Sequence, residues 1–161
     1  MNRMMIAPIM GAALLAGCSS SALMVDRPPA VATKVSTAKL EYVAPTIGVE
    51  DGTQAYLRQK MDDALLSGKS AVFAPGDEIT IRYQFVGHNE GSRAARWLTG
   101  GLAGGSKTYI QVDFVNATGE VVGRVRAEGS VGVGIAGGSA KTGIDAAVKK
   151  IAAYAMTTFK R

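Results

Sequence analysis

Hydrophobic and polar residues alternate in several segments after residue 36, and these segments predict the strands of a sheet. The clearest is residues 78–86, in which Ile79, Ile81, Tyr83 and Phe85 share one face and polar side chains take the other. Turn residues separate the segments, and the valines and glycines of residues 129–138 either extend the last strand or loop away. The remaining strand segments are residues 37–44, 70–74, 108–115 and 120–128.

Two longer segments have the period of an amphipathic helix. In residues 51–67, Leu57, Met61 and Leu65 share a face, and Gly68 follows as a stop signal. In residues 139–159 one apolar stripe runs along the whole segment. It consists of Ile144, Val148, Ile151, Ala155 and Phe159.

The order of the expected elements is strand, helix, strand, strand, strand, strand, helix. Turns join the later strands, so we expect these strands to be antiparallel. Half-buried alternation leaves one face of the sheet to the helices and the other to solvent. The sequence therefore predicts an α+β fold with a mostly antiparallel sheet of four to five strands and two helices packed on one face.

The N-terminus has the features of a secretory signal. Arg3 precedes an apolar, uncharged run over residues 4–17, which is shorter than the roughly 20 residues of a transmembrane helix. The run ends in Leu15-Ala16-Gly17-Cys18, which resembles the lipobox of bacterial lipoproteins. The resemblance implies cleavage before Cys18, a diacylglyceryl group on its thiol and a fatty acyl chain such as palmitate on its amine. The alternatives are an ordinary signal peptide with a chance cysteine, or a buried core cysteine.

The segment after Cys18 predicts a flexible tether and a location in the cell envelope. Ser19 at the next position favours the periplasmic face of the outer membrane over retention at the inner membrane. No period holds over the Ser- and Pro-containing residues that follow, and about 18 such residues reach roughly 20–25 Å. We expect residues 1–17 to be a removed signal peptide, residues 18–36 an acylated flexible tether, and residues 37–161 a single domain.

Little in the composition points to catalysis. The chain has one His and one Cys, so neither a zinc site nor a nucleophile–base pair is indicated. His88 is interpreted as a solvated loop residue. The net charge is +5, but no basic run is interleaved with aromatic residues, which argues against nucleic acid. Gly132, Gly134 and Gly137 match a dinucleotide-binding spacing without the following strand, so a strand packed closely against another backbone is the preferred interpretation. We expect a protein that is not an enzyme and that uses no cofactor or metal.

The unusual residues gather in residues 87–107, between two expected strands. Ser92 can cap a short helix in which Arg93 and Arg96 share one side, and Ala94, Trp97 and Leu98 give an apolar side. A segment that consists mostly of glycine follows. The loop glycines selected as site residues are Gly91, Gly100, Gly101, Gly104 and Gly105.

At this loop the chain resembles a known family, the bacterial "domain of unknown function 4410" lipoproteins. The resemblance is carried by Gly91-Ser92-Arg93-Ala94-Ala95-Arg96-Trp97-Leu98, by the glycines that follow, by Thr118-Gly119-Glu120 and by the alanine-rich terminal helix. It covers about residue 46 to the end. It implies the fold and an envelope location and carries no catalytic mechanism.

Three interpretations of the loop remain open. Arg93, Arg96, Trp97 and Leu98 either anchor another envelope protein, since Trp and Arg are frequent hot spots, or contact lipid at a membrane interface, or fold back onto the sheet. We expect an outer-membrane lipoprotein that faces the periplasm and acts as a binding or envelope-assembly module. The alternative is a structural or stress-related lipoprotein whose loop contacts lipid or peptidoglycan.

Overall fold

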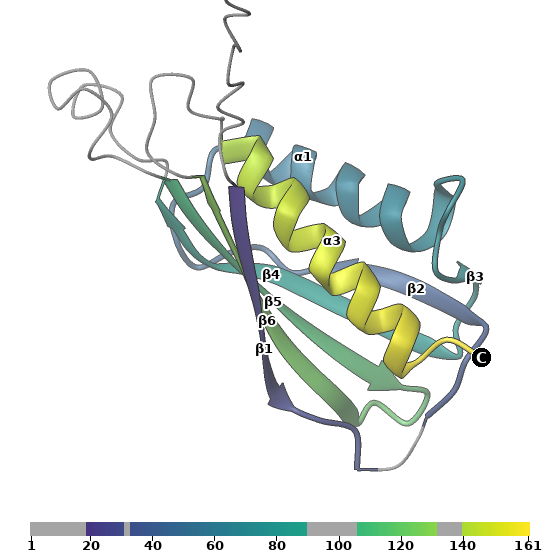
Figure 1. The fold of residues 1–161 in the computed structure, drawn as a ribbon. Coiled ribbons are helices and arrows are strands. Elements are labelled where there is room, and N and C mark those ends of the chain that lie inside the picture. The colour runs from purple at the N-terminus through teal and green to yellow at the C-terminus, as the bar shows by residue number, and fades with distance from the viewer. Residues whose placement is uncertain (1–18, 31–32, 90–105, 132–139) are drawn as a thin grey trace, which may run out of the picture.

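The computed structural model describes residues 19–30, 33–89, 106–131 and 140–161. Within these ranges the chain forms one sheet with two α-helices on the same face of it (Figure 1). The α+β class predicted from the sequence is confirmed, and so is the placement of both helices on one face. The sheet itself differs from the prediction in its number of strands and in their directions.

In the described residues the sheet has six strands, in the order β1-β6-β5-β4-β2-β3. β4, β5 and β6 form an antiparallel meander, as predicted for the later strands, and β1 adds to the free side of β6. β2 pairs with β4 in parallel because helix α1 connects them and returns the chain to the end at which β2 begins. The sheet is therefore mixed. Its strands are β1 Ser19–Arg27, β2 Thr37–Tyr42, β3 Ala74–Pro75, β4 Ile79–Asn89, β5 Ser106–Asn116 and β6 Val121–Val131.

The first predicted helix is present, but its end is a wider coil. Helix α1 spans Asp51–Asp62 and passes directly into a π-helical segment, η1, Asp63–Ser67. The Gly68 N–H donates to the Asp63 carbonyl oxygen at 2.9 Å, the spacing of a π turn. A Cβ atom at Gly68 would overlap that same oxygen, which explains why glycine ends the segment.

The second predicted helix, α3, spans Ala140–Thr158 and lies across β6, β1 and β5. The apolar face of the sheet packs against both helices. Phe114 of β5 stacks on Phe159, just after α3, with ring centroids 4.3 Å apart. The residues that the periodicity assigned to the core are buried: Leu57, Met61, Leu65, Ile79, Ile81, Tyr83, Phe85, Ile144, Val148, Ile151, Ala155 and Phe159.

The segment predicted to be a flexible tether is part of the fold. Ser19–Arg27 forms β1, whose pairing with β6 runs from Ser19 opposite Val131 to Arg27 opposite Arg124. Further on, the Val35 N–H donates to the Phe159 carbonyl oxygen at 2.8 Å and Val35 accepts from the Arg161 N–H at 2.9 Å. Among the described strands, β1 has one hydrogen-bonded neighbour. It packs only part of its surface, so its sequence shows little of the hydrophobic–polar alternation of the inner strands.

The expected strand at residues 70–74 is reduced to Ala74–Pro75. A turn closes at Ala71, whose N–H donates to Gly68. The next two amides are also used locally, because Val72 donates to Ala64 and Phe73 donates to Leu65. Because the amides of Val72 and Phe73 are bonded to the end of the helix, these two residues cannot pair with the sheet. Their side chains are buried in the core instead.

Candidate functional site

The residues selected from the sequence as functional lie outside the described ranges. This holds for the expected lipid-attachment residue, the Arg and Trp positions of the loop and the loop glycines. They are Cys18, Gly91, Arg93, Arg96, Trp97, Leu98, Gly100, Gly101, Gly104 and Gly105. The structure does fix the strand ends from which these segments depart.

These strand ends converge at one end of the sheet. Asn89 is opposite Lys107 across β4 and β5, and Val131 is opposite both Ser106 and Ser19. We call this the Ser19 end of the sheet. The beginning of β1, the end of β4, the beginning of β5 and the end of β6 meet there, next to the first turn of α3 (Figure 1). Residue 18 and the loop at residues 90–105 therefore connect to the same end of the molecule.

A backbone contact holds α3 against the sheet near this end. Gly129 of β6 approaches Gly143 of α3 so closely that a Cβ atom at position 129 would overlap the Gly143 carbonyl group. The close-packing interpretation of the glycine-rich segment is therefore confirmed at Gly129. The glycines with dinucleotide-binding spacing, Gly132, Gly134 and Gly137, lie outside the described ranges.

His88 is not a loop residue as the sequence suggested. It belongs to β4, where the register shifts between Phe85 and Gly87. Such a bulge re-aims the side chains that follow it. The His88 ring lies 5.7 Å from the ring of Phe85, and its Nδ1 is 3.0 Å from the hydroxyl of buried Thr108. The side chain is thus partly enclosed beside the core. Within the described ranges, no three His, Cys, Asp or Glu residues are grouped so that they could hold a metal ion.

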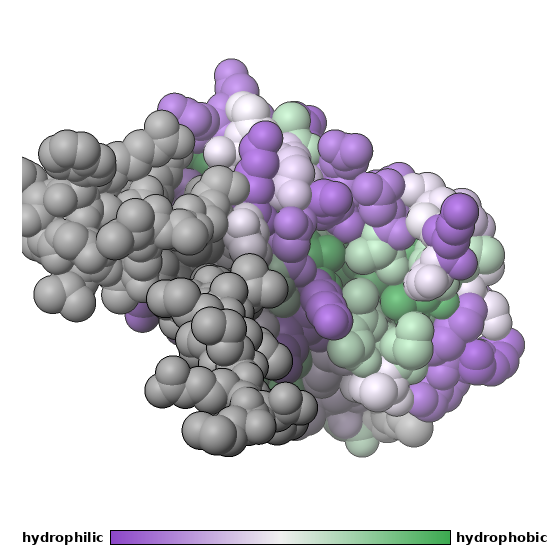
Figure 2. All heavy atoms as spheres, turned by 45° about the horizontal axis from the view of Figure 1, so that its top comes forward, coloured by the Kyte–Doolittle hydropathy of each residue, from purple (hydrophilic) through white to green (hydrophobic). Residues whose placement is uncertain are grey.

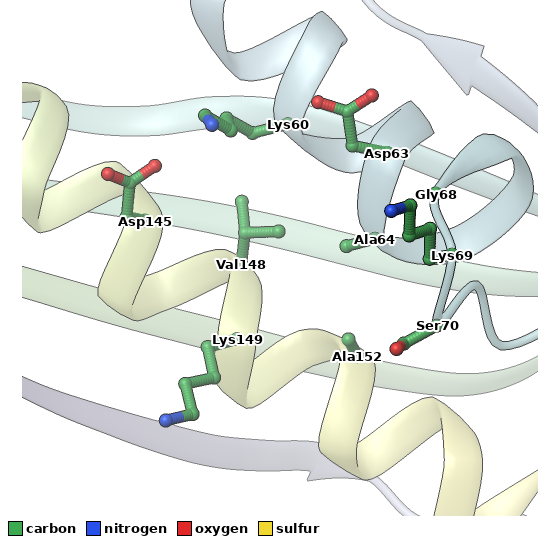
Figure 3. Close-up of a pocket in the computed structure, with 10 residues that line it drawn as sticks. All are labelled: Lys60, Asp63, Ala64, Gly68, Lys69, Ser70, Asp145, Val148, Lys149 and Ala152. Atoms are coloured by element: carbon green, nitrogen blue, oxygen red, sulfur yellow. The ribbon is translucent and has the colours of Figure 1, made fainter.

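A groove separates α1 and η1 from α3 (Figure 3). Its volume is about 440 Å³, and its apolar wall is made by Ala64, Val148 and Ala152. Figure 2 shows hydrophobic surface framed by hydrophilic residues on this side of the molecule. Charged and polar side chains line the rest of the groove: Lys60, Asp63, Lys69, Ser70, Asp145 and Lys149. Sequence reasoning missed this groove because it needs the relative position of two helices that are far apart in the chain.

Tyr56 links the two helices beside the groove. Its hydroxyl donates to the two Asp145 carboxylate oxygens, at 2.8 and 3.0 Å. Burial, the hydrogen bond to Asp145 and the charge of that carboxylate together raise the pKa of Tyr56 to about 12. The ammonium groups of Lys60 and Lys141 lie 5.4 and 5.1 Å from the centre of the Tyr56 ring, within the range of cation–π attraction. The carboxylate of Asp145 is thereby committed to a structural contact.

The face of the sheet opposite the helices carries cross-strand charge pairs. Arg124 of β6 binds Asp113 of β5 with two hydrogen bonds, Nε to Oδ1 at 2.6 Å and Nη2 to Oδ2 at 2.8 Å. The hydrogen bonds and the negative charge of Asp113 raise the pKa of Arg124 above its usual value. A more exposed pair joins Arg82 to Glu41 at 3.0 Å. The charges on this face are largely matched with one another, so it is not a field of one sign that would select a ligand.

Comparison with known proteins defines the family. A family model described as "Domain of unknown function (DUF4410)" matches residues 54–150. The chain belongs to this family. The matched residues span α1 to the middle of α3 and include the Gly-Ser-Arg-Ala-Ala-Arg-Trp-Leu segment from which the resemblance was inferred. No curated protein matches this member of the DUF4410 family.

Solved structures resemble this chain at low sequence identity. The dodecamer of a PelC variant from Paraburkholderia phytofirmans has 10% identity and a TM-score of 0.51, with 88% of this chain and 100% of that chain covered. A protein described as a putative lipoprotein from Caulobacter crescentus CB15 has 20% identity and a TM-score of 0.44, with 73% of this chain and 88% of that chain covered. The PelC likeness supports the fold. None of the helices in the described ranges is long and apolar enough to cross a membrane.

Proposed function

We propose that this DUF4410 protein is an acylated lipoprotein of the outer membrane that faces the periplasm and acts as a non-catalytic binding or envelope-assembly module. The observation that carries the anchoring part is the junction between motif and fold. The lipobox-like motif ends at Cys18, and strand β1 begins at Ser19. A cut before Cys18 would therefore keep the whole of β1 in the mature chain.

The binding part rests on the loop at residues 90–105. β4 and β5 are paired up to Asn89 and Lys107, so the sheet presents the loop from a fixed base. Within the loop, Arg93, Arg96 and Trp97 are the residue types that most often carry binding energy at protein interfaces. We assign them the role of the partner anchor, with Leu98 beside them and the loop glycines as close-approach positions.

The alternative is a structural lipoprotein whose loop contacts lipid or peptidoglycan. One observation favours the lipid form of this alternative. The strand ends that hold the loop lie at the Ser19 end, next to the residue that would carry the acyl chains. Trp97 and Leu98 would then enter the interface region, and the arginines would contact lipid phosphates.

In vivo crosslinking separates these roles. A photoreactive amino acid replaces Trp97, and a matched control places it at Ala117 in the β5–β6 turn at the opposite end of the sheet. The binding proposal predicts one discrete protein adduct from position 97 and none from position 117. That adduct can be a second copy of this chain, as PelC forms a dodecamer in its solved structure. Adducts with phospholipid alone would support the alternative, and no adduct from position 97 would refute both.

A flotation assay tests the lipid contact without the anchor. The domain from Ser19 onward, lacking Cys18, is mixed with vesicles of phosphatidylethanolamine and phosphatidylglycerol. Flotation that is lost in the Arg93→Glu/Arg96→Glu double variant would support lipid contact by the loop. A domain that does not float in either form refutes this contact and leaves protein binding as the function of the loop.

A further inference from the structure

We infer that the Ser19 end of the sheet is a membrane-facing surface whose orientation is set by strand β1. The occupant of this surface is a phospholipid bilayer. The inference rests on the proposed acylation of Cys18 and deepens it. A flexible tether would let the domain rotate freely over the membrane, whereas a strand that begins one residue after the anchor restricts that rotation.

The continuity of β1 is the first observation that supports a fixed orientation. Its register with β6 is unbroken from Ser19 opposite Val131 to Val25 opposite Val125. Leu23 of β1 also packs against the core under α3. Acyl chains on Cys18 would therefore be joined to a hydrogen-bonded strand by a single peptide unit, and not by the 18-residue tether that the sequence predicted.

The length of the strands is the second observation, because it separates the two ends of the sheet. β5 and β6 each contain 11 residues, and at about 3.3 Å per residue such a strand is roughly 35 Å long. The turn at residues 116–120 thus lies at the far end of the sheet from Ser19. It is a compact turn in which the Asn116 side chain accepts hydrogen bonds from the N–H groups of Thr118 and Glu120. With the Ser19 end at the bilayer, this turn is held well away from it.

Charge at the Ser19 end agrees with this surface. Lys107 at the start of β5 has a side chain that is 57% exposed, although it is paired with Glu128 at 3.2 Å. Lys141 in the first turn of α3 is exposed, with its ammonium group near the ring of Tyr56. Cations at a membrane surface are attracted to lipid phosphates.

The test measures the distance of two sites from the bilayer in the full acylated protein. The one native thiol, Cys18, is consumed in the thioether, so an introduced cysteine is the only one free. A fluorophore is attached to Lys141→Cys at the Ser19 end or to Ala117→Cys at the far turn, both of which are exposed positions. The protein is reconstituted in phosphatidylethanolamine–phosphatidylglycerol vesicles that contain a lipid with a nitroxide headgroup.

The inference predicts several-fold stronger quenching at position 141 than at position 117. A matched variant carries 20 additional Gly and Ser residues, beginning with Ser, between Cys18 and Ser19. With a linker of this length, a flexible reach of roughly 25 Å should bring the two positions close to equal quenching. Equal quenching in the protein without the linker, or stronger quenching at position 117, would overturn the inference while leaving the anchor intact. Failure of the protein to remain with the vesicles would instead overturn the acylation proposal and the orientation that depends on it.

Discussion

Gly129 in β6 and Gly143 in α3 touch backbone to backbone, so the first half of α3 lies directly on the sheet. This contact also holds α3 close to the Ser19 end, because Gly129 is paired with Ser21 of β1 and with Thr108 of β5. A side chain at position 129 would have to displace the helix. The contact therefore couples the packing of α3 to the strand that would carry the anchor.

Replacing Gly129 by alanine should destabilise the fold. The new Cβ atom meets the Gly143 carbonyl group, and overpacking of this kind costs about 1–3 kcal/mol. Chemical denaturation of the non-acylated domain measures the free energy of unfolding. Gly52→Ala is the control, since nothing lies within 4 Å of a Cβ atom there. The control should be neutral or slightly stabilising, and equal losses in both variants would contradict the contact.

The Arg124–Asp113 pair should contribute more to stability than the Arg82–Glu41 pair. Asp113 is buried and accepts two hydrogen bonds from Arg124, whereas the side chains of Arg82 and Glu41 are 43% and 46% exposed. Double-mutant cycles with alanine should give a coupling of about 1–2 kcal/mol for the first pair. The exposed pair should give less than about 1 kcal/mol. A larger coupling energy for the Arg82–Glu41 pair than for the Arg124–Asp113 pair would contradict this ranking.

Titration of Tyr56 should make stability depend on pH in the alkaline range. Its pKa is raised from 10.0 to about 12 in the folded state, first by burial and then by Asp145. The neutral phenol is favoured by folding, so this contribution is complete below pH 10 and is lost as the pH rises from 10 toward 12. Tyr56→Phe should flatten the loss of stability in that window, measured by denaturation at a series of pH values. Tyr109→Phe serves as the control, and an unchanged profile in Tyr56→Phe would refute the coupling.

Titration of Glu78 should make stability depend on pH in the acid range. The N–H groups of Ser36 and Thr37 both donate to its Oε2 at 2.7 Å, and these bonds, with the Thr37 hydroxyl, hold its pKa below the usual 4.5. The carboxylate therefore adds stability above pH 4.5, and this stability is lost as the pH falls through the lowered pKa. Glu78→Gln should reduce stability at neutral pH and lessen its acid dependence. Glu120→Gln, in the exposed β5–β6 turn, is the matched control variant.

The inner elements of the fold could be predicted because their side chains are buried on one face only. Ile79, Ile81, Tyr83 and Phe85 alternate with polar residues, and each is buried as the period predicts. The stripe of α3 from Ile144 to Phe159 is buried for the same reason. The parallel pairing of β2 with β4 followed from the helix between them and could have been inferred from the predicted order of elements.

The edge of the sheet could not be read in the same way. In β1, Leu23 faces the core while Met24 and Val25 are 43% and 45% exposed, so apolar residues occur on both sides of the strand. Its stability comes from backbone pairing with β6, which leaves no mark on the pattern of side chains. The groove between the helices was missed because Lys60 and Lys149 are ordinary surface residues until α1 and α3 are packed together.

The N-terminal modification is the most direct test of the account. Mass spectrometry of the protein extracted from the outer-membrane fraction should find a mature chain that begins at Cys18 and carries a diacylglyceryl group and an amide-linked acyl chain. Cys18→Ser should remove the protein from this fraction and leave it soluble in the periplasm. An unmodified Cys18, a different mature N-terminus, or a Cys18→Ser protein that stays in the membrane would contradict the claim that strand β1 directly follows a lipid anchor.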